Sequence, residues 1–279
     1  MKLRSAPVLL AAALAAPALA QLEAPAPSPK ATETQRVGLT DVTLSYSRPG
    51  VKGRTIWGEL VPWDKPWRTG ANQATTITLS DDVMVQGQKL AAGTYSIVTI
   101  PGRDEWTVVF NTDTKLWFET EYDAAKDVLR VKSKPEAIPM LESLRIGFPS
   151  VFPTSAVLAI EWEKVRVPVT ISVDVDAKIR KQLAAADAAS WQAPLTAARY
   201  WFDQKTNREE AWKLLEKSIA TNRNWMNVSR KARVLADEGK LAEAVKAGDE
   251  AIALAKADPG KPNTAAFEKT VAEWKAKAK

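Results

Sequence analysis

Residues 47–73, with the sequence SRPGVKGRTIWGELVPWDKPWRTGANQ, combine side chains that could bind a ligand. The segment holds three tryptophans, five cations and only two acids. The aromatic and cationic members are Trp57, Trp63, Trp67, Arg48, Lys52, Arg54, Lys65 and Arg68. Guanidinium groups pair with carboxylates and phosphates, and indole faces suit sugar rings or cations. The pattern predicts an ordered loop that binds an anionic or carbohydrate-like ligand.

The same composition permits a purely structural interpretation. The tryptophans could plug one end of a β-sandwich, since tryptophan is mostly buried and long loops are packed by their own side chains. The arginines would then bond loop carbonyls and nearby acids. If a ligand exists, we expect Arg68 and Asn72 to be its foremost contacts. The full predicted ligand-binding set is Arg48, Arg54, Trp57, Trp63, Trp67, Arg68, Asn72 and Gln73.

Acidic side chains elsewhere suggest two other kinds of site. In NTDTKLWFETE, the oxygens of Asn111, Asp113, Glu119 and Glu121 could bind calcium, but the spacing lacks the Asp-x-Asp-x-Asp-Gly loop. A solvated turn is the favoured interpretation there. Glu161 and Glu163 could act as the paired carboxylates of a glycosidase, but that mechanism needs two groups across a cleft. Two positions on one strand do not provide that separation, and Trp162 between them fits a core anchor.

The chain has no histidine and no cysteine. This excludes Ser-His-Asp and Cys-His catalysis, as well as zinc, copper and iron sites that use imidazole or thiolate ligands. Acid–base chemistry would fall to carboxylates, Lys or Tyr. We predict no catalytic residue, metal site or cofactor. The formal net charge of +6 is too small and too dispersed to predict a nucleic-acid partner.

The first twenty residues have the pattern of an export signal. A positive head at Lys2 and Arg4 precedes an apolar run over 9–16, which is too short to span a bilayer. The small-residue motif at 18–20 predicts cleavage after Ala20, and therefore a periplasmic or secreted protein without a transmembrane segment. The proline- and alanine-rich segment 21–34 is expected to be a flexible leader.

The remaining chain divides where the hydrophobic period changes. Over 35–175, alternation such as Val42, Leu44 and Tyr46 and frequent turn signals predict an antiparallel β-sandwich or barrel. Over 176–279, helical spacing predicts an α-helical region. The sequence thus indicates an α+β protein of two domains. Six helices are expected, over 176–190, 193–204, 208–220, 224–237, 241–256 and 263–278.

The helical region has a weak internal repeat. Ala211 and Ala244 occupy equivalent positions in segments that align 33 residues apart, close to the period of tetratricopeptide repeats. This predicts helical hairpins of that kind, which could hold a protein partner or simply pack on themselves. Asn207 with Glu210 has the pattern of a capping box at the start of a helix.

Several motifs of the β half occur in the order found in a known family. They are Tyr46-Ser-Arg-Pro49, Lys52-Gly-Arg54, Trp67-Arg-Thr-Gly-Ala-Asn72, Ala92-Gly-Thr-Tyr-Ser96 and the Ile100-Pro101 turn. With these motifs the chain resembles a bacterial exported family known only as domain of unknown function 2911. The resemblance implies no reaction. The family pattern often has an acid after the asparagine, whereas this chain has Gln73, so a carboxylate role is not expected there.

The sequence therefore predicts an exported binding or interaction protein rather than an enzyme. Its β domain would carry the cationic, tryptophan-rich site, and its helical region would offer a surface to a protein partner. Two alternatives remain open. One is a carboxylate- or metal-dependent hydrolase of envelope sugars or peptides, and the other is a structural envelope component in which the loop is a plug.

Overall fold

The computed structural model describes residues 24–278. The predicted signal and its cleavage site lie outside the described residues, as does the start of the predicted leader. The chain forms two compact units. One is built mainly on Asp41–Ser150 and Val157–Ile171, and the other contains Ser172 and the residues that follow it. The α+β architecture in two parts is therefore confirmed.

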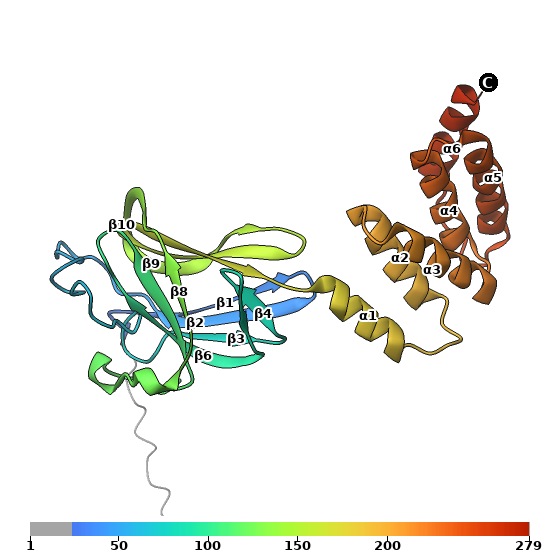
Figure 1. The fold of residues 1–279 in the computed structure, drawn as a ribbon. Helices are drawn as coiled ribbons and strands as arrows, with labels where there is room; N and C mark the ends of the chain where they lie inside the picture. Colours follow the sequence, from blue (N-terminus) through green and yellow to red (C-terminus); the bar gives the residue numbers. More distant parts are fainter. Residues whose placement is uncertain (1–23, 279) are drawn as a thin grey trace, which may run out of the picture. The chain divides into compact units, whose positions relative to one another are not determined.

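Two antiparallel layers of strands make up the β half of the chain (Figure 1). The strands are β1 (Lys30–Val37), β2 (Thr40–Ser47), β3 (Thr76–Leu79), β4 (Val83–Val85), β5 (Gln88–Leu90), β6 (Gly93–Ile100), β7 (Trp106–Asn111), β8 (Asp127–Ser133), β9 (Glu136–Val151) and β10 (Ser155–Ser172). A six-stranded sheet has the order β1-β2-β3-β6-β7-β8, and a four-stranded sheet has the order β5-β4-β10-β9. Two short 3-10 turns, Glu119–Glu121 and Ala124–Lys126, lie between β7 and β8.

The six-stranded sheet forms because apolar residues alternate along its strands. In β2 the buried positions include Val42 and Leu44, and antiparallel pairing places Leu44 opposite Ile77 of β3. Every residue of β7 is buried. Pairs such as Ile97 with Phe110 continue the apolar layer from β6 into β7. The alternation in β2 buries one face of that strand and fixes its register, whereas β7 is buried on both faces.

Two β elements, β1 and β10, depart from simple sequence rules for strands. Strand β1 begins at Lys30, within the segment predicted as a flexible leader, so the β domain starts before residue 35. Its half-buried positions include the polar Glu33 and Gln35, so the sequence of β1 lacks the alternation of apolar and polar residues that indicates a strand. The final strand is continuous over β10, although Glu163 has a left-handed backbone with φ of 56°. Proline is usually confined to edge strands, yet Pro168 lies within β10, and β10 lies between β4 and β9.

The helical region consists of six helices among the described residues. They are α1 (Val175–Ala185), α2 (Gln192–Gln204), α3 (Arg208–Thr221), α4 (Trp225–Asp237), α5 (Leu241–Ala257) and α6 (Ala265–Lys277). A core of small and aromatic side chains joins the last three, including Ala232, Ala251 and Phe267. At Gly248 of α5, an added Cβ would lie 2.6 Å from Val271 Cγ2, so this glycine permits close helix contact. None of the described helices is long and apolar enough to cross a membrane.

The capping box predicted at Asn207 is wrong. Asn207 has φ of 44°, makes no side-chain cap, and donates from Nδ2 to Asp176 Oδ1 at 2.9 Å. The reciprocal cap lies instead at α4. Asn224 Oδ1 accepts from the backbone N–H of Met226 at 3.0 Å and of Asn227 at 3.3 Å, and Asn227 Oδ1 accepts from Asn224 N–H at 3.1 Å. The left-handed backbone of Asn207 turns its side chain away from the start of α3.

Replacing the α4 cap tests this assignment. We expect Asn224→Ala to lower the free energy of unfolding of the helical region by about 1 kcal/mol, because two backbone donors lose their acceptor. Asn207→Gly should cost less, since glycine accepts φ of 44° without strain. Urea denaturation followed by far-UV circular dichroism measures both. Equal losses for the two variants would contradict the assignment.

Candidate functional site

The loop 47–73 is held against the sheets by backbone bonds. Trp67 N–H donates to Thr99 O at 2.7 Å, and Thr99 N–H returns a bond to Trp67 O at 2.9 Å. At the start of the loop, Val51 N–H donates to Glu142 O at 2.8 Å. These bonds join an irregular segment to β6 and β9. The loop is therefore an ordered part of the β half, as its tryptophan content predicts.

Four tryptophans pack together beneath the loop. Trp57 and Trp67 come from the loop, Trp106 from β7 and Trp162 from β10. The ring centroids of Trp57 and Trp106 are 4.9 Å apart at an interplanar angle of 73°, and those of Trp67 and Trp162 are 5.7 Å apart and stacked at 18°. Aromatic pairs of this geometry contribute about 0.5–1.5 kcal/mol each beyond the area they bury. The cluster thus attaches the loop to strands of both sheets.

Two of the predicted arginines bond to backbone carbonyls. Arg48 donates from Nε to Leu144 O at 2.9 Å. Arg54 donates from Nε to Val51 O at 3.1 Å and from Nη2 to Gly50 O at 2.6 Å. These contacts match what the structural interpretation of the loop expects of its arginines. They give Arg48 and Arg54 a role in holding the loop.

Arg68 differs from these two. Its Nη1 pairs with Glu119 Oε1, whereas its Nε is buried and has no hydrogen-bond partner among the described residues. The next residue, Thr69, is fully buried at φ of 59°, a rare backbone conformation for a β-branched residue. Bonds from Thr69 Oγ1 to Trp67 O at 3.2 Å and from Thr75 Oγ1 to Thr69 O at 2.7 Å hold it there. Strain of this kind often accompanies functional sites.

A recess of about 590 Å³ lies beside Arg68. The charged residues that line it are Lys52, Arg54, Lys65, Arg68 and Glu119. The uncharged lining comes from the loop, the segment before β1 and β10, and comprises Pro27, Ser28, Pro49, Gly50, Leu60, Val61, Pro62, Pro66, Trp67, Gly70, Ala71 and Trp162. The described lining therefore combines four cations, one carboxylate and a largely apolar wall. Its volume suits a small ligand.

The segment before β1 forms one wall of this recess. Arg48 N–H donates to Pro29 O at 2.9 Å, and Asn72 Nδ2 donates to Ser28 O at 3.3 Å. Lys52 Nζ lies 3.5 Å from Pro27 O. The proline-rich segment, which was expected to be a flexible leader, is thus hydrogen-bonded to the loop 47–73. The proline spacing gives no sign of this contact.

The recess gathers three of the eight predicted ligand-binding residues, namely Arg54, Trp67 and Arg68. Trp67 is only 5% exposed, so it forms part of the floor. Asn72 and Gln73 are exposed residues beyond the lining, and Arg48 is turned toward Leu144. Whether these eight residues contact a ligand stays a prediction.

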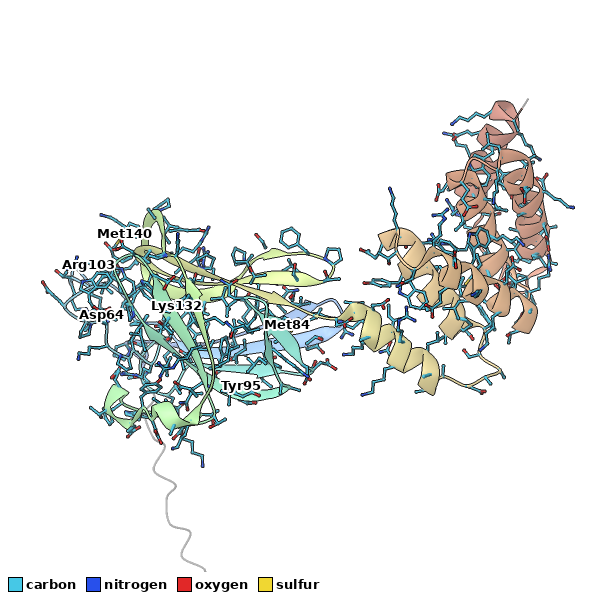
Figure 2. All side chains as sticks on the ribbon, viewed as in Figure 1. Asp64, Met84, Tyr95, Arg103, Lys132 and Met140 are labelled. Atoms are coloured by element: carbon cyan, nitrogen blue, oxygen red, sulfur yellow. The ribbon has the colours of Figure 1, made fainter. Side chains whose placement is uncertain are left out.

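Trp57 and Trp63 lie apart from the recess. Trp57 borders a smaller depression of about 350 Å³ with Arg54 and Glu163, and its Nε1 is buried without a partner among the described residues. Trp63 stacks under Arg103, whose Cζ is 5.4 Å from the ring centroid. Figure 2 labels Arg103 and the neighbouring Asp64 at the same end of the β half. Of the three tryptophans of the loop, Trp57 and Trp67 therefore share one cluster and only Trp67 lines the recess, whereas Trp63 packs separately against Arg103.

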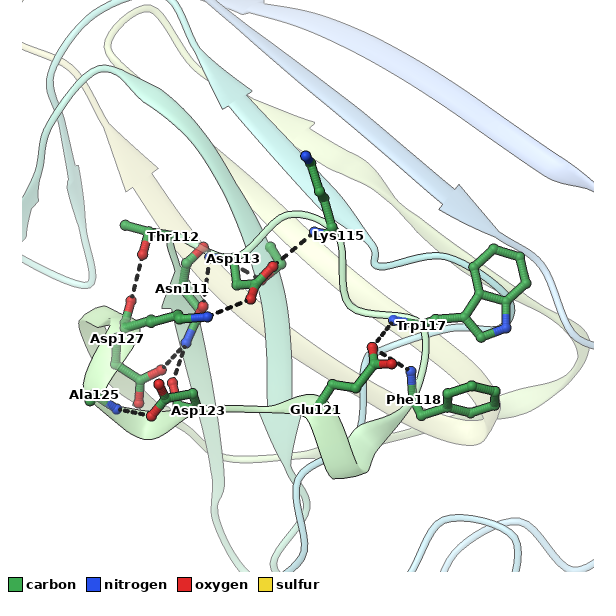
Figure 3. Close-up of polar contacts among 12 residues, drawn as sticks. Asn111, Thr112, Asp113, Lys115, Trp117, Phe118, Glu121, Asp123, Ala125 and Asp127 are labelled. Atoms are coloured by element: carbon green, nitrogen blue, oxygen red, sulfur yellow. Dashed lines mark hydrogen bonds and ion pairs between the residues drawn. The ribbon is translucent and has the colours of Figure 1, made fainter.

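Two exposed aromatics just before Glu119 were missed by the sequence reasoning. Trp117 is 45% exposed and Phe118 is 56% exposed. Their backbone N–H groups donate to Glu121 Oε2 at 2.7 and 3.3 Å, and their rings point away from the polar network around Asn111 (Figure 3). Two adjacent aromatic residues among polar neighbours, as in KLWFETE, are the sequence pattern that could have indicated an exposed aromatic pair.

The acids of the same segment form a turn. Asn111 Nδ2 donates to Asp127 Oδ1 at 2.7 Å and Asp123 O at 2.9 Å, and Lys126 Nζ pairs with Asp113 Oδ2 at 2.8 Å (Figure 3). Glu119 and Glu121 have separate partners, as described above. No group of acids in the described part of the chain is arranged to hold a metal ion. The hydrogen bonds around Asn111 are those of a turn, which is the favoured interpretation of this segment.

Glu161 is a buried carboxylate on strand β10. It is 2% exposed and accepts from Arg145 Nε and Arg166 Nε, both at 2.6 Å. Burial alone would raise the pKa of Glu161, but the hydrogen bonds and charges of the two arginines outweigh it and hold that pKa below its ordinary value. A general acid for glycoside hydrolysis needs the opposite shift. Glu161 is therefore a structural anion.

The family model for proteins of unknown function (DUF2911) matches residues 28–171. This is more than half of the 279 residues, so the chain belongs to that family and the resemblance seen in its motifs is confirmed. The match includes every lining residue of the recess except Pro27. No curated protein and no solved structure matches the chain. The tetratricopeptide character of the helical region stays a prediction.

The role of Glu161 is testable through pH. Because its folded-state pKa lies below the ordinary value of 4.5, its contribution is complete above pH 4.5 and is lost as the pH falls through the folded-state value. We expect Glu161→Gln to lower the free energy of unfolding at pH 7 by about 3 kcal/mol. The variant should also lose stability less steeply in acid than the natural protein. Parallel pH profiles of the midpoint temperature would contradict this role.

Proposed function

We propose that this protein is an exported, non-enzymatic binding protein whose recess takes an acidic saccharide. The observation that carries the proposal is the recess itself, which combines four cations and one carboxylate with a wall of prolines and tryptophans. Such a mixture of apolar walls and a few convergent polar groups is typical of small-ligand sites. A sugar that carries a carboxylate or phosphate offers complementary chemistry in one molecule.

The cations of the recess differ in how far their side chains are already hydrogen-bonded within the protein. Arg54 already bonds to two carbonyls, whereas Lys65 is an exposed lining residue. Arg68 has one nitrogen paired with Glu119 and another buried without a partner among the described residues. A ligand anion could therefore bind Lys65 and exchange with Glu119 at Arg68. We assign charge recognition to these two side chains.

The saccharide part of the proposal depends on the apolar lining. Pro49, Pro62 and Pro66 present rigid apolar surface, and the stacked pair Trp67 and Trp162 closes the floor. Sugar rings have apolar faces that lie well on flat surfaces of this kind. Because a proline ring has little conformational freedom to lose, the wall is formed before a ligand arrives.

The hydrolase alternative is less well supported. Two-carboxylate hydrolysis needs a pair of acids across the cleft, and within the described lining Glu119 is the single carboxylate, paired with Arg68. Glu161 is held by Arg145 and Arg166. The structural alternative is supported by the tryptophan cluster and by Arg48 and Arg54, but it leaves the cationic recess without a role.

Export and partner binding complete the proposal. We infer a periplasmic or secreted location from the signal pattern over 1–20 and the predicted cleavage after Ala20. The helical region would bind a protein partner, because α2 and α4 border a hollow rich in arginine. On this view one unit binds a small anion and the other a macromolecule.

Substitution of the two recognition cations tests the recess. We expect Lys65→Ala and Arg68→Gln each to weaken the binding of D-glucuronate by roughly tenfold, the loss expected when one charge-assisted contact is removed. Isothermal titration calorimetry gives the dissociation constant, and thermal unfolding shows whether the variants remain folded. Lys134→Ala removes an exposed cation outside the recess and is the matched control. Unchanged binding in folded variants, or general unfolding of both, would favour the plug.

Glu119 competes with a ligand for Arg68 and gives a test of opposite sign. We expect Glu119→Gln to strengthen glucuronate binding about threefold or more. In the variant, Arg68 does not have to break an ion pair with a protein carboxylate before it binds the carboxylate of the ligand. Neutral D-glucose should show no such gain. Titration of both sugars against the variant separates the charge effect from ring stacking. Weaker glucuronate binding would mean that Glu119 instead holds Arg68 in its binding position.

A further inference from the structure

Three arginines surround one hollow in the helical region. The hollow has a volume of about 410 Å³ and lies between α2 and α4. Its lining consists of Leu195, Arg199, Trp225, Met226, Ser229, Arg230 and Arg233. All seven residues belong to these two helices, and all lie outside the family match over 28–171. The hollow is therefore a feature of the helical unit alone.

Helical spacing explains why these side chains meet. On α2, Leu195 and Arg199 are four residues apart and share one face. On α4, Met226, Arg230 and Arg233 follow one another at intervals of four and three residues, which also places them on one face. Arg230 Nη2 donates to Arg199 O at 3.3 Å and so joins the two helices at the hollow. The result is a cationic face built by two adjacent helices.

The three guanidinium groups are neutralised unequally. Arg230 pairs with Asp203 at 2.6 Å, and its Nε is buried without a partner among the described residues. Arg233 lies over the ring of Phe267, with Cζ 4.9 Å from the centroid. Arg199 and Arg233 form no ion pair with any described acid. The face thus keeps two positive charges that a partner could neutralise.

An apolar surface accompanies these charges. Met226 is 44% exposed, although it is a large apolar side chain, and the half-buried Trp225 precedes it at the start of α4. The buried Leu195 adds apolar surface to the lining of the hollow. The backbone donors of α4 are already capped by Asn224, so the end of the helix is not itself the anion site. Recognition would combine guanidinium contacts with one inserted apolar side chain.

We propose that this arginine-lined hollow binds a short acidic segment of a partner protein, in which Asp or Glu residues flank an aliphatic side chain. The aliphatic group enters between Leu195 and Met226, and carboxylates bind Arg199 and Arg233. Arginine is well suited to such contacts because its planar fork bonds carboxylates in pairs. This deepens the partner-binding role proposed above for the helical region and does not depend on what the recess binds.

A peptide suits this site better than a nucleic acid. A nucleic-acid face needs an extended basic surface, whereas here Asp203 lies beside Arg230 and interrupts the positive charge. The volume is sufficient for a few side chains only. An acidic segment with one aliphatic anchor matches both the size and the mixed character of the hollow.

Fluorescence anisotropy on the whole chain tests the proposal. The probe is a labelled peptide of alternating Glu and Leu, and the control peptide has Gln in place of Glu. We expect the Glu peptide to bind, with an affinity that falls as sodium chloride is raised. The double variant Arg199→Ala/Arg233→Ala should weaken binding by tenfold or more, and Lys217→Ala on α3, an exposed cation outside the hollow, should not. Met226→Glu should weaken it as well, since it adds a repelling charge at the rim.

Three results would overturn the proposal. They are equal binding of the Gln peptide, unchanged binding by the folded double variant, and an absence of binding to the Glu peptide. Circular dichroism checks that the variants are folded. Arg68→Gln serves as the cross-control: if it abolishes peptide binding while the double variant does not, the peptide sits in the recess. Titration of the double variant with glucuronate then shows whether the recess still binds its ligand when the arginine-lined hollow is disabled.

Discussion

The structure of the recess depends on the packing of four tryptophans. Trp57 and Trp67 belong to an irregular loop, whereas Trp106 and Trp162 belong to strands of different sheets. Without this contact only backbone bonds and the arginine–carbonyl bonds of Arg48 and Arg54 would hold the loop. A segment of that length loses considerable conformational entropy on ordering. The cluster provides large apolar burial where no regular period exists. A rigid loop in turn keeps a hollow open beside it.

In the proposed function, binding and structural roles divide among the cations of one short segment. Arg48 and Arg54 bond to carbonyls and maintain the loop, while Lys65 and Arg68 face the recess. Structural and binding interpretations of the loop are therefore compatible, because they concern different side chains. The strained backbone at Thr69 supports the same division, since it places Arg68 next to a buried residue whose hydroxyl and carbonyl are hydrogen-bonded.

Much of the fold followed from local patterns, and the site followed only in part. Five of the six helices begin and end within two residues of their expected ranges, because apolar spacing and breaks such as Gly239 mark them strongly. The exception is α1, which ends at Ala185 and not at the expected residue 190. Strand β1 was missed because its inward residues are polar. The separation of Trp57 and Trp63 from Arg68 could not be foreseen, because a loop without periodicity gives no rule for the direction of its side chains. The wall formed by Pro27 and Ser28 depends on contacts with residues far along the chain.

The measurement that tests the central claim most directly is the mapping of amide shifts by NMR during titration with D-glucuronate. If the recess is the binding site, shifts should concentrate on Lys65, Arg68 and Gly70, with the indole N–H of Trp67 also affected, and D-glucose should produce much smaller changes. Shifts that are absent, or that spread evenly over exposed lysines such as Lys134, would contradict the account and leave the loop with a structural role alone.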